Sequence, residues 1–131
     1  MSLVRFFQKG GPVMWPILAL SIAGLAILVW KALEFRAGRR DGRGLAVVST
    51  IITAEPMLGI LGTVTGIIQT FGAFKLSDSA SPLAATAGIG EALVTTAAGL
   101  VAALILIFPY NFLLGLLAKA AARLESDEEE A

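Results

Sequence analysis

The sequence predicts an all-α integral membrane protein with three transmembrane helices. Hydrophobic residues make up 56% of the 131 residues and charged residues only 15%, whereas a soluble domain carries roughly 25% charged residues. The charges leave three long uncharged runs, at residues 10–30, 56–74 and 92–118. About 20 apolar residues cross a bilayer as a helix. The remaining residues are too few to build a soluble body around three such segments.

The same composition excludes several classes of function. The chain has no His and no Cys, and ten basic residues balance ten acidic ones. Thiolate or imidazole metal sites, disulfides and nucleophiles that depend on Cys or His are therefore absent. Zero net charge gives no electrostatic footprint for nucleic acid. We expect no enzymatic activity, no metal or cofactor, and no nucleic-acid partner.

The first transmembrane helix is predicted at residues 12–35. Pro12 suits a first helical turn, where the missing N–H would have no partner in any case. Trp15 and Trp30 lie near the two ends, where indole rings favour the boundary between membrane and water. The uncharged run is longer than the apolar segment of a secretory signal, which has roughly 7–15 residues. We therefore expect a retained helix.

A basic loop is predicted at residues 36–54, because its first part reads RAGRRDGRG. The second helix is expected at residues 56–74, after the Glu55–Pro56 interruption, with a helical lead-in from Leu45 left open. An outer loop at residues 75–83 follows. It contains Asp78, Ser79 and Ser81, which are typical turn or cap residues.

The third helix is predicted at residues 84–122, longer than the bilayer is thick, so that it must tilt or project from the membrane. The last residues, 123–131, form an acidic tail. Acidic residues oppose the helix dipole at a C-terminus, and we expect this tail to fray.

The orientation follows from the Lys and Arg residues near the helix ends, because loops rich in these residues stay in the cytoplasm. One side of the membrane receives seven of them and the other side three. This asymmetry predicts the N-terminus outside and the C-terminus inside. The seven are Lys31, Arg36, Arg39, Arg40, Arg43, Lys119 and Arg123; the three are Arg5, Lys9 and Lys75.

Small residues on the second and third helices indicate close helix packing. Gly59, Gly62 and Gly66 share one face of the second helix, and Gly62 and Gly66 form a small-xxx-small pair. Thr95 and Gly99 share a face of the third helix. Because such faces let two backbones approach closely, we expect them to build a closed, symmetric homo-oligomer. Ordinary helix packing is the alternative.

Glu91 stands out as an ionisable residue inside a hydrophobic segment, and the sequence suggests that it is the only one there. A carboxylate in a bilayer is costly, and it usually faces a bundle interior or a water-filled path. Thr95 lies one helical turn further along the same face, and Thr96 is one position round. The alternative is that Glu91 reaches the outer headgroups or caps its helix.

Two spaced motifs, GILGTVTGII and GIGEALVTTAAGLV followed by PYN, resemble the MotA/TolQ/ExbB proton-channel family, and most closely its ExbB/TolQ branch. The opening GGPVMWPILALSIAGLAI also resembles the first helix of that branch. Together the similarity covers residues 10–34 and 54–125. On these motifs Glu91 matches the transmembrane Glu of the family. Thr63 matches the Thr of its second helix, and Thr96 the Thr of its third helix.

The resemblance implies a homopentameric channel in the bacterial inner (cytoplasmic) membrane, around a single-helix partner of the ExbD/TolR/MotB type that carries an essential Asp. Proton-motive force would then drive an envelope process. Glu91 is expected to face the lumen, with Thr63 and Thr96 holding water beside it. Iron-complex uptake, envelope maintenance, secretion and gliding are all compatible with the residues.

The chain departs from the family pattern in three places. The gap between the first two helices lacks most of the usual cytoplasmic domain, Glu55 stands where a small residue is common, and Pro109 directly precedes Tyr110. Two other functions stay open. One is a membrane scaffold that does not conduct, and the other is a proton carrier like the small subunit of a rotor ring, which has only two helices.

Overall fold

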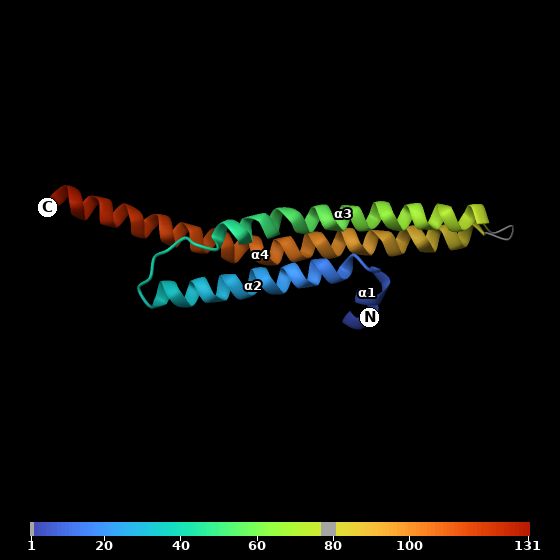
Figure 1. Cartoon of the computed structure of the whole chain (residues 1–131), viewed down its shortest axis with the longest axis horizontal. Helices are drawn as coiled ribbons and strands as arrows, with labels where there is room; N and C mark the ends of the chain where they lie inside the picture. Colours follow the sequence, from blue (N-terminus) through green and yellow to red (C-terminus); the bar gives the residue numbers. More distant parts are fainter. Residues whose placement is uncertain (1, 77–80) are drawn as a thin grey trace.

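A computed structural model describes residues 2–76 and 81–131 of the chain. In these residues the elements are α1 (Leu3–Lys9), α2 (Met14–Arg36), α3 (Leu45–Leu76) and α4 (Pro82–Glu130). The antiparallel helices α3 and α4 lie side by side, and α2 runs along them (Figure 1). Three helices, α2, α3 and α4, are long and apolar enough to cross a membrane. The prediction of an all-α protein with three membrane spans is confirmed at this level.

Helix α2 begins just after a glycine-rich turn and crosses a distance of about 35 Å. Gly11 has φ +71°, a conformation that favours glycine because it has no Cβ to clash with the backbone. The short α1 precedes this turn, and Phe7 packs edge-to-face on Trp15 with ring centroids 5.1 Å apart. At the other end of α2, the indole of Trp30 donates a 2.8 Å hydrogen bond to Glu34.

Helix α3 begins at Leu45, eleven residues before the predicted start, and it continues through Pro56. Residues 45–54, assigned to the basic loop, are therefore helical, as the open lead-in allowed. The reason is packing: Leu45, Val48 and Ile51 recur at helical spacing, are buried, and belong to the apolar core with Leu28, Leu106 and Leu113. A proline is tolerated within a membrane helix when neighbouring helices support the backbone.

Helix α4 has 49 residues and a length of about 74 Å, so it is far longer than a bilayer core of about 30 Å. Ser81 is its N-cap and accepts a hydrogen bond from the Ala84 N–H at 3.3 Å. Asp78 and Ser79, the other expected turn or cap residues, lie outside the described residues. The C-terminal part of α4 projects beyond α2 and α3 (Figure 1).

The predicted tail at residues 123–131 is not a separate frayed segment, because α4 continues to Glu130. Its Arg, Leu and Glu residues are strong helix formers, whereas the unfavourable interaction of exposed acids with the dipole amounts to only about 0.3–1 kcal/mol. In this segment the helix propensity of the residues therefore outweighs the unfavourable interaction of the acids with the helix dipole.

The outer faces of the three long helices stay strongly apolar. Large side chains such as Ile22, Leu25, Phe108 and Phe112 are exposed, the last two by 73% and 71%. Contiguous apolar surface of this kind marks contact with lipid or with other chains. The buried interior lies along the α3–α4 contact, which positions the functional residues described next.

Candidate functional site

Glycines bring α3 and α4 into close contact along one seam. A Cβ at Gly62 would lie 2.6 Å from Thr95 Oγ1, and one at Gly66 would lie 2.7 Å from the Cβ of Ala92. A Cβ at Gly59 would lie 2.9 Å from the carbonyl oxygen of Thr95. All three distances are shorter than real Cβ contacts allow. Only glycine fits at these positions.

The seam lies within one chain. The structure brings together the small residues that the sequence singled out, with Gly99 packed on the backbone of Glu55 and Gly59. Thr95 is 1% exposed and faces Gly62. We expected these faces to join neighbouring chains, but in the structure they pack against each other within one chain.

Thr63 and Thr96 form a hydroxyl pair across the seam. Thr63 Oγ1 also lies 3.0 Å from the carbonyl oxygen of Ala92, and Thr96 Oγ1 lies 3.2 Å from that of Gly59. Each hydroxyl has a single hydrogen to donate. When Thr63 donates to Thr96, Thr96 donates to Gly59. In the reverse order Thr63 donates to Ala92, or to the carbonyl oxygen of Gly59 at 3.3 Å. The two hydroxyls can thus exchange the roles of donor and acceptor by rotation.

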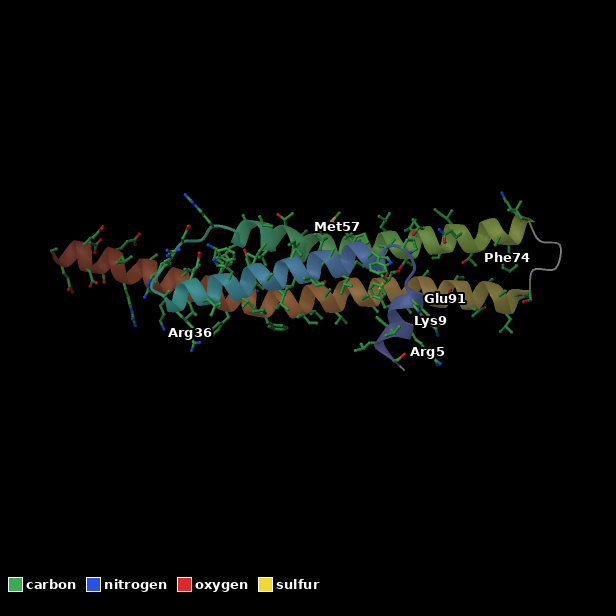
Figure 2. The ribbon with its side chains drawn as sticks, turned by 60° about the horizontal axis from the view of Figure 1, so that its bottom comes forward. Arg5, Lys9, Arg36, Met57, Phe74 and Glu91 are labelled. Atoms are coloured by element: carbon green, nitrogen blue, oxygen red, sulfur yellow. The ribbon has the colours of Figure 1, made fainter. Side chains whose placement is uncertain are left out.

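Glu91 lies at the same seam but is exposed in the single chain. It lines a cavity of about 150 Å³ with Lys9, Gln69 and Thr65, among others. Figure 2 shows Glu91 on α4 beside Lys9, where α1 approaches α4. In residues 2–76 and 81–131 no hydrogen bond joins Glu91 to Thr63 or Thr96. The structure therefore brings the two threonines together, whereas Glu91, five residues before Thr96 on α4, is not bonded to either of them.

The link between Glu91 and the hydroxyl pair is the backbone of the next residue. The carbonyl of Ala92 accepts from Thr63 and, at 2.6 Å, from Thr95. Two hydroxyls of the seam thus converge on the carbonyl oxygen of the residue that follows Glu91.

Glu55, which the sequence placed at a helix boundary, is instead a buried polar residue of the bundle. It lies in the interior of α3 with 0% of its surface exposed, so the expectation that Glu91 is the only ionisable residue in a hydrophobic segment is wrong. Its Oε1 lies 2.6 Å from Ser21 Oγ on α2. A signal existed: Glu55 shares a helical face with Gly59 and Gly62 once the helix is extended back to Leu45.

In the described part of the chain, no group of three or more His, Cys, Asp or Glu side chains is placed to hold a metal ion. The polar groups of the seam are hydroxyls, carbonyls and two carboxyls. Such groups accept, donate and pass protons.

Comparison with known proteins gives a matching family model and several similar proteins. Residues 29–126 match the model of the MotA/TolQ/ExbB proton channel family. A Synechocystis sp. protein named as ExbB-like 1, a biopolymer transport protein, is 44% identical over 92 residues, covering 68% of this chain and 36% of that protein. The biopolymer transport protein ExbB of Salmonella typhimurium is 39% identical over 74 residues, covering 56% of this chain and 30% of that protein.

A Methanothermobacter thermautotrophicus protein named as an ExbB homolog is 48% identical over 73 residues, covering 56% of this chain and 25% of that protein. The chain thus spans between a quarter and about a third of the length of these relatives. No solved structure gives a significant match.

Proposed function

The chain belongs to the MotA/TolQ/ExbB proton channel family, a family of channels rather than enzymes, and we propose from this premise that it is a proton-conducting subunit of a membrane motor. The observation that carries the proposal is the α3–α4 seam. There Thr63 of the Thr63–Thr96 pair bonds to the carbonyl oxygen of Ala92, the residue that follows Glu91. Glu91 exchanges the proton, and the two hydroxyls pass it on through water.

The chain is a multi-pass membrane protein, and we place it in the bacterial inner membrane with its N-terminus outside and its C-terminus inside. The excess of Lys and Arg in residues 31–43 and 119–123 supports this orientation. Glu91 then lies toward the outer side, and the basic loop before α3 faces the cytoplasm.

The functional unit is a closed homo-oligomer, most simply the pentamer of the family, around a single-helix partner of the ExbD/TolR/MotB type. Two features support assembly. Glu91 is exposed in one chain, and a carboxylate that meets lipid is unfavourable. The exposed apolar faces of α2 and α4, with Leu25 and Phe108 among their residues, offer the surface that copies can cover.

Two alternatives fit less well. A rotor-ring carrier has two helices, whereas this chain has three candidate spans. A scaffold that does not conduct explains the glycine packing, but it gives no role to the Thr63–Thr96 pair or to Glu91.

Proton flux tests the proposal directly. The chain is purified with a single-helix protein that carries an intramembrane Asp and is encoded beside it, and the complex is reconstituted in phospholipid vesicles. A potassium gradient with valinomycin supplies the driving force, and a trapped pH-sensitive dye reports the flux. We expect flux above that of protein-free vesicles. Flux equal to that of protein-free vesicles, from a complex that is intact by native mass spectrometry, favours the scaffold.

A further inference from the structure

The hydrogen bonds around the buried carboxyl group of Glu55 depend on whether that group carries a proton. Ser21 Oγ lies 2.7 Å from the carbonyl oxygen of Ile17 and 2.6 Å from Glu55 Oε1. A serine hydroxyl has one hydrogen, and a carbonyl oxygen only accepts. If Ser21 donates to Ile17, the contact between Ser21 and Glu55 needs a hydrogen from the carboxyl group. Both contacts are satisfied together only when Glu55 carries a proton.

The surroundings of Glu55 favour the same state. Its Oε2 is buried and has no hydrogen-bond partner among the residues that the structure describes. An ionised carboxylate there would be a buried charge without a cation. The facing helices bring the Ser21 hydroxyl from α2 and the backbone of Gly99 from α4.

The titratable groups of the facing helices are distant along their axes. On α2 the nearest to Ser21 is Lys31, ten residues away or about 15 Å. On α4 the nearest to Gly99 are Glu91 and Tyr110, at eight and eleven residues or about 12 and 16 Å. The charge state of Glu55 therefore depends on its burial and on its hydrogen bond to Ser21, because the titratable side chains of α2 and α4 are distant.

Glu55 lies deeper in the bundle than Glu91. The cavity at Glu91 is lined by residues 10–13, which precede α2, whereas Glu55 is level with Ser21 in the interior of that helix. Glu91 is adjacent to Ala92, which faces Gly66, and Gly66 lies eleven residues from Glu55 on α3, or about 16 Å. Along α3, Thr63 falls between the two levels. The polar groups thus follow the seam from Glu91 past the threonines to Glu55.

We infer that Glu55 and Ser21 form a second proton-binding site of the channel, on the cytoplasmic half of the bundle beyond the Thr63–Thr96 pair. The inference rests on the proposed proton conduction. When Glu55 carries the proton, its carboxyl group donates to Ser21, and Ser21 donates to the carbonyl oxygen of Ile17. When the proton leaves, the Ser21 hydroxyl rotates and donates to the carboxylate. One proton is bound and released, and every bond in both states has a donor and an acceptor.

Infrared spectroscopy and flux together test this site in the reconstituted complex with its single-helix partner. At neutral pH the wild type should show the C=O stretching band of a neutral carboxyl group. One component of this band should persist in Glu91→Gln and be lost in Glu55→Gln. Proton flux should fall about tenfold or more in Glu55→Gln, because a positioned proton-transfer group is lost. Thr53→Val, which removes an exposed hydroxyl on the same helix, is the matched control and should change neither signal.

A band that is unchanged in Glu55→Gln, or full flux in Glu55→Gln after that component is lost, overturns the inference. If Glu55→Gln does not assemble, Ser21→Ala decides instead. Loss of the hydrogen-bond acceptor should shift the carboxyl band and alter the pH dependence of flux, and an unchanged band overturns the site. The proposed function fails separately, when Glu91→Gln leaves flux intact.

Discussion

Replacing Glu91 by Gln is expected to abolish proton flux while the oligomer stays assembled. Glutamine keeps the shape and hydrogen-bonding capacity of glutamate but cannot release a proton. Proton transfer by a positioned side chain contributes about 10²–10⁴-fold, so flux should fall at least about a hundredfold. The vesicle assay with the partner present measures the loss. Native mass spectrometry of the same preparation should give an unchanged oligomeric mass.

The matched control is Glu125→Gln, which makes the same substitution on the exposed, projecting part of α4. Flux should stay at the wild-type value. Equal flux in wild type and Glu91→Gln would show instead that Glu91 only reaches the lipid headgroups.

Replacing Gly62 by Leu should separate α3 from α4 and remove both stability and conduction. A Cβ at this position already lies within 2.7 Å of two side-chain atoms of Thr95, and Leu adds three further carbons. Overpacking of a close contact costs about 1–3 kcal/mol. The separation also breaks the Thr63–Thr96 pair next to it. A lowered midpoint of thermal unfolding in detergent, together with lost flux, reports the change.

Gly72→Leu is the matched control on the same helix, because no atom in the described part of the chain lies within 4 Å of a Cβ built there. Its unfolding midpoint should equal that of the wild type. Equal midpoints for Gly62→Leu and Gly72→Leu would contradict the assignment of the seam to one chain.

Much of the fold could be predicted from the sequence because the bilayer imposes a simple constraint. Backbone groups in lipid must be satisfied within helices, so each uncharged run of sufficient length marks a span. The small residues of the seam were also visible as a pattern, since Gly59 and Gly62 share a helical face. The helix that packs against these glycines could not be predicted, because the spacing of residues on one helix does not determine which helix covers it.

The errors have a common physical cause, in that local signals were given more weight than packing. The Glu55–Pro56 pair favoured a break before α3, whereas burial of Val48 and Ile51 against α2 and α4 keeps residues 45–54 helical. The sequence placed Glu55 at this interruption, whereas in the structure it is buried and Ser21, 34 residues earlier in the chain, supplies its hydrogen-bond partner. A contact over such a sequence distance is fixed only by the tertiary arrangement.

The most direct test of the account is an experimental structure of the assembled oligomer with its single-helix partner in a lipid nanodisc. We predict a closed ring in which Glu91 of each chain faces the central lumen and the partner helix. The Thr63–Thr96 pair should lie next to it along the seam between α3 and α4. A ring in which Glu91 points outward to the lipid headgroups, away from the lumen, would contradict the account.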